Sequence, residues 1–398
     1  MAHRVGIVGA SGYGGAELVR LLDAHPELEL EVVGAHQQAG EPVAALYPNL
    51  PGDRLFDEVD LGRLIGLDLV FLATPHGPSL QLGAALRRAG TGVVDLSGAF
   101  RLSAADFSRW YGEEHPAPDL TPEPGAMRGE ADATGDGGAG DDVSDGGASV
   151  ASATVAGGTG DDATDGEAAT DGDAVDGEAP AQRAVYGLPE LFREAITGAG
   201  FVANPGCYPS AALLALAPLA GMLEAGTVVV DGKSGTSGAG RAVADRLHFS
   251  HVHADLTAYG APTHRHTGEI ETWLPGDLGA VSFTPHLIPM SRGLLTTAYA
   301  GVQQGVSAPD VQAALHDAYD DEPFVHVLEP GVFPHTKALA GSNGAQVSAL
   351  LDERVGRVVV TCAIDNLGKG AAGQALQNAN LMLGLPETTA LTAIGVYP

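Results

Sequence analysis

The sequence predicts an α/β protein of two domains, the first of which is built on a doubly wound parallel sheet. Two patterns support this fold class. The chain opens with a strand, a glycine-rich turn and a helix, and two further apolar strands at 69–73 and 92–96 flank a helical stretch at 79–89. With 398 residues, 44% of them hydrophobic, the chain is long enough to bury the cores of two domains.

The opening turn predicts a phosphate-binding site. Gly9, Gly12 and Gly15 lie between a strand at 4–8 and a helical repeat at 18–22. They permit a tight turn and let a phosphate approach the N-terminus of the helix. We therefore predict a Rossmann-type dinucleotide site. The spacing G-x-x-G-x-x-G differs from the commoner G-x-G-x-x-G, so an ordinary tight turn is the alternative.

The end of the next strand, residues 28–33, indicates which dinucleotide binds. An NAD site usually presents an acidic residue there to the ribose hydroxyls. This chain has Gly34, Ala35 and His36 instead. Because no carboxylate repels a 2′-phosphate and His36 can contact one, NADP is preferred over NAD.

Doubly wound sheets bind their ligands at the carboxyl ends of the strands. This rule places the segments 74–77 and 97–101 around the binding crevice. Arg101 is a candidate for binding phosphate or carboxylate, because its guanidinium group donates hydrogen bonds in a rigid fork. His76 is interpreted as a loop residue.

One of only two cysteines, Cys207, lies in the segment Asn-Pro-Gly-Cys-Tyr-Pro at 204–209, just before an apolar helical repeat at 211–223. A helix N-terminus stabilises an anion, so we expect the pKa of this thiol to be lowered and a nucleophilic thiolate to be available. A buried structural cysteine is the alternative. The bracketing Pro and Gly residues favour the nucleophile.

A glycine-rich loop at 232–241 follows a predicted strand at 227–230. It contains the Gly-Lys-Ser order of a phosphate loop, but Thr227 occupies the position of the leading glycine, which excludes that motif. The loop is predicted either to line a substrate pocket with its backbone amides or to be a simple turn.

A cluster of histidines follows this loop. No thiol and no known ligand spacing accompany the cluster, so no metal site is predicted. His266 stands at the predicted start of a helix, where a general acid or base can be held rigidly. A histidine satisfied in the core or at the surface is the alternative, but Cys207 elsewhere in the chain favours catalysis. The five histidines are His248, His251, His253, His264 and His266.

The charge of the chain is strongly negative. Fifty acidic residues against 20 Lys and Arg give a formal net charge of −30, which disfavours nucleic acid and anionic membranes as partners. The acid excess favours adaptation to high intracellular salt, which screens charge. An ordinary acidic protein from a G+C-rich genome is the alternative.

The chain carries no pattern of export or membrane insertion. No apolar stretch has membrane length, the N-terminus lacks a signal-peptide pattern, and two cysteines make no disulfide framework. A cytoplasmic location is therefore expected.

Residues 129–182 contain 14 Asp or Glu and no Lys, Arg or His. Such a segment cannot bury enough apolar surface to offset the entropy cost of ordering. We expect a disordered insert in a surface loop, and a docking segment for a basic partner is the alternative.

Six motifs together resemble the N-acetyl-γ-glutamyl-phosphate reductase family, in the same order and over nearly the whole chain except the acidic insert. The family includes relatives that reduce glutamyl or aminoadipyl phosphates on a small amino-group carrier protein, for arginine and lysine synthesis. Gly98 and Ala99, where Ala and Asp are expected, and Gly268, where Pro is usual, favour the carrier-protein branch over the free acetylated substrate. The motifs are residues 9–17, 204–209, 233–241, 264–266, 283–293 and 365–377.

The resemblance implies a domain organisation. It comprises an NADP-binding domain over 1–206 that contains the insert 129–182, and an α+β catalytic and dimerisation domain over 207–363. A C-terminal helix within 364–398 returns to the first domain. A homo-oligomer and a small-molecule acyl phosphate, free or presented on an acidic carrier protein, are implied as partners.

The resemblance also implies covalent chemistry. Cys207 attacks the acyl phosphate to form a thioester, NADPH reduces the thioester to the semialdehyde, and His266 moves protons. The implied substrate-binding residues are Arg101, Ser234 and Arg241. The implied cofactor contacts are Ser11, Gly12, Tyr13, Gly14, Gly34, Ala35, His36 and Asn366.

Two other classes of protein compete with this interpretation. A short-chain dehydrogenase requires Tyr-x-x-x-Lys, but Val229, Phe333 and Asp365 lie four residues before the three lysines, so that class is excluded. A non-catalytic NADP-binding sensor protein is the more distant alternative, although it would not need Cys207 beside a histidine motif.

Overall fold

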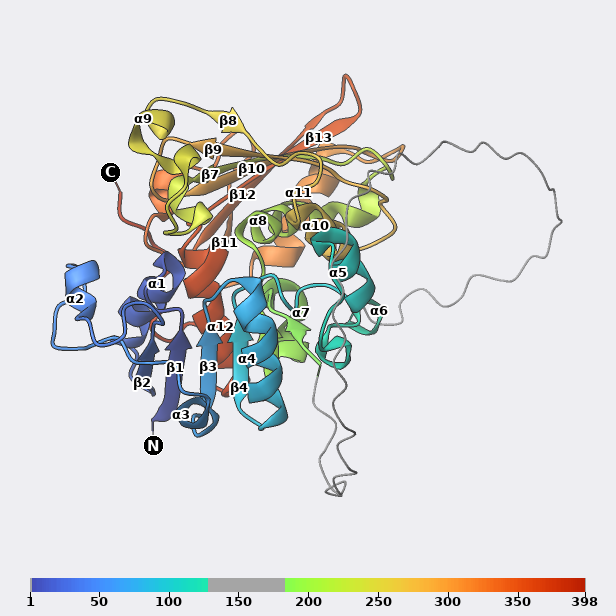
Figure 1. The fold of residues 1–398 in the computed structure, drawn as a ribbon. Coiled ribbons are helices and arrows are strands. Elements are labelled where there is room, and N and C mark those ends of the chain that lie inside the picture. Colours follow the sequence, from blue (N-terminus) through green and yellow to red (C-terminus); the bar gives the residue numbers. More distant parts are fainter. Residues whose placement is uncertain (1, 128–182, 398) are drawn as a thin grey trace, which may run out of the picture. The chain divides into compact units, whose positions relative to one another are not determined.

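The computed structural model describes residues 2–127 and 183–397, which belong to one compact unit (Figure 1). The acidic insert predicted at 129–182 lies outside the described residues. Two sheets organise the described part of the chain, and Figure 1 shows them as a blue sheet and a yellow to red sheet.

The first sheet is built from parallel strands that confirm the predicted ones. It comprises β1 (His3–Val8), β2 (Leu28–Gly34), β3 (Leu69–Leu72), β4 (Gly92–Asp95), β5 (Val185–Tyr186) and β6 (Phe201–Ala203), in the order β2-β1-β3-β4-β6-β5. The register aligns Val8 with Gly34 and Leu72, Leu72 with Asp95, and Asp95 with Ala203. The strands therefore end at one edge, where sheets of this type bind ligands.

Helices pack on both faces of this sheet, which confirms the doubly wound prediction. On one face Ile7 and Phe71 belong to the same apolar cluster as Leu18, and on the other face Leu72 packs in a second cluster with Leu86. The helices of this region are α1 (Tyr13–Leu22), α2 (Val43–Leu46), α3 (Leu61–Ile65), α4 (His76–Arg88), α5 (Ala104–Tyr111), α6 (Pro124–Met127) and α7 (Pro189–Ile196).

His76 is the first residue of α4 and not a loop residue as interpreted from the sequence. Helix α4 begins before Pro78, because proline is tolerated in the first turn of a helix, where its missing N–H group would have no partner.

The second sheet is mixed and has seven strands in the order β11-β12-β13-β10-β7-β9-β8. Its face beneath α8 (Cys207–Leu216) and α11 (Ala308–Tyr319) is apolar, because alternate residues such as Leu294 and Ala298 are fully buried. The strands are β7 (Val229–Gly235), β8 (Thr257–Ala258), β9 (Ser282–Ile288), β10 (Leu294–Gly301), β11 (Val325–Val327), β12 (Ala345–Asp352) and β13 (Arg357–Ile364).

Two predicted boundaries in this domain are wrong. The strand expected to end at residue 230 continues to Gly235, so the loop that follows it starts at Thr236. The helix expected over 211–223 starts earlier, at Cys207, and ends at Leu216, before Pro218. A 3₁₀ helix, Ala217–Met222, continues the chain, because proline cannot donate the next helical hydrogen bond.

The C-terminal helix returns to the first sheet as predicted. A π-helical turn, Gly368–Ala372, leads into α12 (Gly373–Met382), which contacts α1, α7 and β4 and is buried along its whole length. Asn378 donates to the carbonyl of Gly187 at 2.8 Å, and His25 bonds Asn380 at 3.0 Å.

Short elements complete the described part of the chain, in which no helix has the length and apolar character needed to span a membrane. They are α9 (Phe249–Val252), α10 (His266–Trp273) and the 3₁₀ turns Pro118–Leu120, Thr236–Ala239, Asp245–Leu247 and Thr336–Leu339.

Candidate active site

Cys207 is the first residue of α8, so its thiol lies at a helix N-terminus as predicted. The loop that leads to it starts at the end of β6, where the N–H of Asn204 donates to the carbonyl of Asp95 at 2.8 Å. The fully buried Asn204 side chain donates to the carbonyl of Ala371 at 3.2 Å. The loop before Cys207 is thus connected to the first sheet and to the C-terminal segment.

His266 is the first residue of α10, and its ring lies against the residue that precedes Cys207. A Cβ at Gly206 would lie 2.5 Å from His266 Nε2, so only glycine allows this approach. From another side, a Cβ at Gly370 would lie 2.8 Å from the Cβ of Cys207. The structure therefore brings the two predicted catalytic residues together around Gly206.

The surroundings of Cys207 oppose ionisation of its thiol. Burial raises the pKa of Cys207 to about 11, although the positive charge of Arg101 and the N–H of Tyr208 act in the opposite direction. The helix N-terminus favours the anion as expected, but the loss of hydration is the larger effect. The expectation of a lowered pKa and a preformed thiolate is therefore wrong, and the thiol needs a base.

His266 can act as that base. Burial, the neighbouring His264 and the positive charges of Arg101 and Arg265 hold the pKa of His266 well below its ordinary value of 6.5. The imidazole is therefore neutral at pH 7, and its buried Nδ1 has no hydrogen-bond partner among the described residues. A neutral imidazole against Gly206, the residue that precedes a protonated thiol, is an arrangement suited to general-base activation of a nucleophile.

Arg101 is buried beside these residues and holds the loop before Cys207. Its Nε donates to the carbonyl of Asn204 at 2.8 Å, and its Nη2 donates to the carbonyl of Leu96 at 2.7 Å. Nη1 pairs with Glu269 at 3.2 Å. Because these three nitrogens donate within the protein, Arg101 positions the loop. Substrate binding by Arg101 stays a prediction.

Glu269 is a buried carboxylate that the sequence analysis did not single out. It accepts hydrogen bonds from the N–H of Gly206 and the hydroxyl of Tyr186, both at 2.8 Å, in addition to the pair with Arg101. His266 and Glu269 lie three residues apart on α10, which places them on one face of the helix. That His-x-x-Glu spacing was the signal in the sequence.

The glycine turn has the geometry of a phosphate site. The N–H groups of Gly9 and Ala10 donate to the carbonyl of Gly34 at 2.9 and 3.0 Å, which joins the turn to β2. A Cβ at Gly15 would lie 2.3 Å from the Gly9 carbonyl oxygen, so glycine permits α1 to pack close to the strand. Gly12 caps α1 without a side-chain hydrogen bond. The N–H groups of the first helical turn have no intrahelical acceptors, so this end of α1 fits a pyrophosphate.

The predicted cofactor residues of this turn line its open side. A Cβ at Gly14 would meet no atom within 4 Å, and the hydroxyl of Tyr47 donates to the carbonyl of Ser11 at 2.7 Å. Burial raises the pKa of Tyr47 to about 12, against the positive charge of Arg241. The exposed Arg241, predicted to bind the substrate, thus acts through its charge on Tyr47, whose hydroxyl binds Ser11 of the glycine turn.

The end of β2 carries a buried Ala35 and an exposed His36. One carboxylate that the sequence analysis missed lies close to this strand end. Asp57 accepts from the N–H of Val33 at 2.8 Å and from Arg63 at 3.1 Å. The charge of Asp57 is therefore compensated by Arg63, which leaves His36 as the exposed titratable side chain at the strand end.

Ser234 and Asn366 lie close together, beside Gly238 in the turn that follows β7. A Cβ at Gly238 would lie 2.9 Å from Ser234 Oγ and 3.5 Å from Asn366 Nδ2. The Asn366 side chain donates to Ser237 at 2.8 Å and accepts from the N–H of Gly293 at 2.7 Å. Their roles toward substrate and cofactor stay predictions.

Replacement of Glu269 by Ala should destabilise the protein by about 3–5 kcal/mol, because it leaves the buried Arg101 without its counter-charge. The free energy of unfolding in denaturant measures this loss. Glu271→Ala is the matched control, since Glu271 lies on the same helix and accepts one N–H, that of Val281 at 2.9 Å. The free energy of unfolding of the control should fall by about 1 kcal/mol. Equal losses in the two variants would contradict the role of Glu269.

Known proteins match this chain along its length. Residues 4–199 match the family model of the semialdehyde dehydrogenase NAD binding domain, and residues 207–366 match that of the semialdehyde dehydrogenase dimerisation domain. N-acetyl-γ-glutamyl-phosphate reductase of Desulforamulus reducens is 40% identical, over 99% of each chain. The enzyme of that name from Thermus thermophilus is 43% identical, over 99% of this chain and 100% of the relative.

Solved structures with the same fold are more distant in sequence. Aspartate semialdehyde dehydrogenase II of Vibrio cholerae, complexed with ASA, superposes with a TM-score of 0.63 at 13% identity, over 96% of this chain and 99% of that chain. Aspartate semialdehyde dehydrogenase of Candida albicans with NADP has a TM-score of 0.60 at 15% identity, with the same coverage. The predicted fold class and enzyme class are thereby confirmed, and the chain belongs to the N-acetyl-γ-glutamyl-phosphate reductases of the NAD(P)-dependent semialdehyde dehydrogenase family.

Proposed function

We propose that this protein is an NADP-dependent acyl-phosphate reductase that converts an N-blocked glutamyl 5-phosphate into the semialdehyde and phosphate, in arginine synthesis. The observation that supports the proposal is the approach of the neutral His266 ring to Gly206, the residue before Cys207. The names of relatives that are about 40% identical supply the substrate class. Aminoadipyl 6-phosphate, in lysine synthesis, is a second candidate substrate.

The reaction would proceed through a covalent step at Cys207. His266 accepts the thiol proton, the sulfur attacks the acyl carbon, and phosphate leaves as the thioester forms. NADPH, when bound, supplies the hydride that reduces the acyl group. His266 then returns its proton to the sulfur of Cys207 as the carbon–sulfur bond breaks and the semialdehyde leaves. Gly206 is essential to this sequence, since a side chain there would displace the imidazole.

The residues at the glycine turn support NADP as the dinucleotide. The N-terminus of α1 suits the pyrophosphate, because no side chain binds its free N–H groups there. Ser11, Gly12, Tyr13 and Gly14 lie around this helix end. His36 is exposed at the end of β2, and the nearby Asp57 is compensated by Arg63. A 2′-phosphate bound there would find the charge of Asp57 already offset by Arg63. Measured preference for NADH over NADPH would contradict this assignment.

The group that blocks the substrate nitrogen is either a small amino-group carrier protein or acetyl. Two departures from the family pattern support a carrier. At Gly98 a Cβ would lie 1.8 Å from the Tyr111 hydroxyl, and at Gly268 it would lie 2.2 Å from Trp110 Nε1. Aromatic side chains thus take up the space beside His266 that other residues would need. The names of the relatives favour acetyl, and kinetic comparison of free and carrier-bound substrate decides between the two.

We also propose a homo-oligomer that pairs through the second sheet. The face of β10 opposite α8 carries Leu295, Thr297 and Tyr299, all partly exposed, and the matching family model is described as a dimerisation domain. Light scattering that gave the mass of a single chain would contradict this proposal.

The negative charge supports a role in a salt-rich cytoplasm, where ions screen the repulsion among acidic residues. The formal net charge of −30 is large for a chain of 398 residues. A melting temperature that does not rise with salt would contradict this adaptation.

The proposed bounds of the domains are 1–206, 207–363 and 364–398.

Cys207→Ser should lower turnover by about a hundredfold or more and leave NADP binding unchanged, because a serine hydroxyl is a far poorer nucleophile than a thiolate. Phosphate-dependent oxidation of the semialdehyde measures turnover, and fluorescence titration measures binding. Cys362→Ala is the control, since Cys362 is buried on β13 and should be dispensable for catalysis. A Ser variant that kept more than about a hundredth of the activity would exclude covalent catalysis at Cys207.

His266→Asn should lower turnover by about a hundredfold and remove the acidic limb of the pH profile of kcat/KM. In the native enzyme this limb lies below pH 6.5, because the pKa of His266 is lowered. His264→Asn should be milder and should move the limb to higher pH, since His264 is one cause of that lowering. The exposed His248→Asn serves as the control. A limb above pH 6.5, or one unmoved by His264→Asn, would contradict the assignment.

A further inference from the structure

A cluster of ionised side chains connects α1 to the end of β13. Arg292, in the turn between β9 and β10, donates to the two carboxylate oxygens of Glu17 at 3.1 and 3.0 Å. Its Nε donates to Asp365 at 2.9 and 3.2 Å. One guanidinium group therefore joins two carboxylates that come from the two ends of the chain.

The two carboxylates depend on this cation. Glu17 is 7% exposed and Asp365 is fully buried. Burial opposes ionisation of Glu17, but hydrogen bonds from Arg292 and Arg20 hold its pKa below the ordinary value. Without Arg292, Asp365 would keep a buried charge with no cation against it, and it would repel Glu17. The ionic link between α1 and the segment after β13 therefore requires Arg292, and it adds to the packing of α1 on the π-helical turn and on α12.

Asp365 orders the segment that leads to the active site. It accepts from the N–H groups of Leu367 at 2.8 Å and Gly368 at 3.1 Å. Two residues further on, Gly370 packs against Cys207. The path from Glu17 through Arg292 and Asp365 thus runs from the first turns of α1, beside the glycine turn, to the nucleophile.

We infer that Arg292 is a positioning residue for the dinucleotide, because it fixes the separation between the glycine turn and Cys207. This inference rests on the proposed NADP-dependent function. A dinucleotide whose pyrophosphate lies at the N-terminus of α1 and whose reactive ring reaches Cys207 must span that separation. Each half of the dinucleotide can bind without the link, but both halves bind together only when the two ends are held at the right distance.

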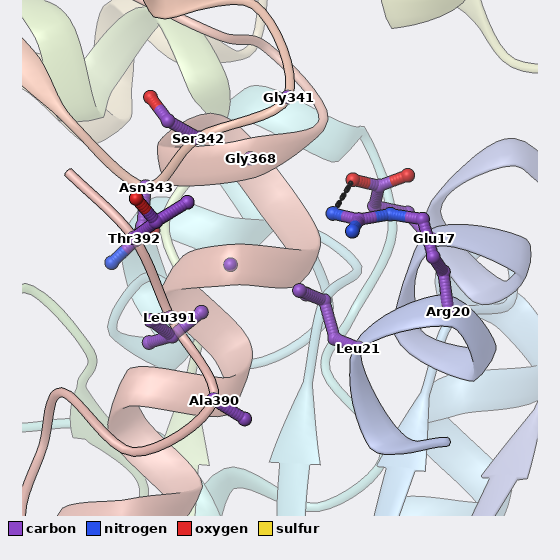
Figure 2. Close-up of a pocket in the computed structure, with 11 residues that line it drawn as sticks. Glu17, Arg20, Leu21, Gly341, Ser342, Asn343, Gly368, Ala390, Leu391 and Thr392 are labelled. Atoms are coloured by element: carbon purple, nitrogen blue, oxygen red, sulfur yellow. Dashed lines mark hydrogen bonds and ion pairs between the residues drawn. The ribbon is translucent and has the colours of Figure 1, made fainter. Parts of the chain in front are cut away.

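Arg20 offers a matched control. It donates to Glu17 at 2.7 Å, but from the same helix, three residues away. Figure 2 shows this pair among the residues that line a cavity, together with Gly341 and Gly368. The volume of the cavity is about 160 Å³. Arg20→Met removes a cation from Glu17 and leaves the link from α1 to Asp365 intact.

The test compares the dissociation constants of NADP and of 2′,5′-ADP, a fragment that keeps the adenosine with its 2′- and 5′-phosphates but lacks the second phosphate of the pyrophosphate and the nicotinamide riboside. Fluorescence or calorimetric titration is carried out on the full chain without substrate. In Arg292→Met the affinity for NADP should fall by about tenfold or more, while the affinity for 2′,5′-ADP stays within about twofold. In Arg292→Lys, which keeps the charge but loses the planar fork, the affinity for NADP should lie between that of Arg292→Met and that of the native protein. Arg20→Met should change neither constant.

The other outcomes overturn the inference. Equal loss of affinity for NADP and for the fragment would show that Arg292 maintains the nucleotide domain as a whole. Unchanged affinity for NADP would show that the separation does not depend on Arg292. If Arg292→Met does not fold, Arg292→Lys is judged by the same two constants. A native protein that binds neither ligand would refute the proposed function itself, which the variants alone cannot do.

Discussion

The active site depends on the hydrogen bond from the N–H of Gly206 to the carboxylate of Glu269, at 2.8 Å. This carboxylate also pairs with Arg101, whose side chain holds the carbonyl of Asn204. Glu269 lies one turn after His266 on α10, so a single helix carries the proposed base and the group that anchors the loop before Cys207. The loop that follows β6 of the first sheet and helix α10 are joined at this point.

Burial determines the protonation states of Cys207 and His266. The same loss of hydration raises the pKa of Cys207 and lowers that of His266. Both groups are therefore neutral at pH 7, and in the proposed mechanism the thiolate forms only when the proton moves to the imidazole. Burying the ion pair between Arg101 and Glu269 costs the hydration free energy of both charges. Hydrogen bonds offset part of this cost, because Arg101 donates to the carbonyls of Asn204 and Leu96 and Glu269 accepts from the hydroxyl of Tyr186. The ion pair is retained because it positions the loop.

Local patterns predicted the parts of the fold that depend on neighbouring residues. The glycine turn, strands β1 to β4 of the first sheet and the helix that starts at His266 follow from periodicity and turn chemistry, whereas the short strands β5 and β6 were not predicted. The raised pKa of Cys207 could not be predicted, because it depends on residues that fold over the thiol from distant segments, such as Gly370. Arg241 was assigned to the substrate, and the effect of its charge on Tyr47 is likewise a long-range interaction. The role of Glu269 was within reach of the sequence through its spacing from His266.

Mass spectrometry of the enzyme mixed with acyl phosphate in the absence of NADPH tests the central claim most directly. If His266 activates Cys207 as a nucleophile, one equivalent of phosphate is released and the peptide containing Cys207 gains the mass of the acyl group. The His266→Asn variant should acylate far more slowly under the same conditions. Release of phosphate without acylation of Cys207, or acylation of another residue, would contradict the claim.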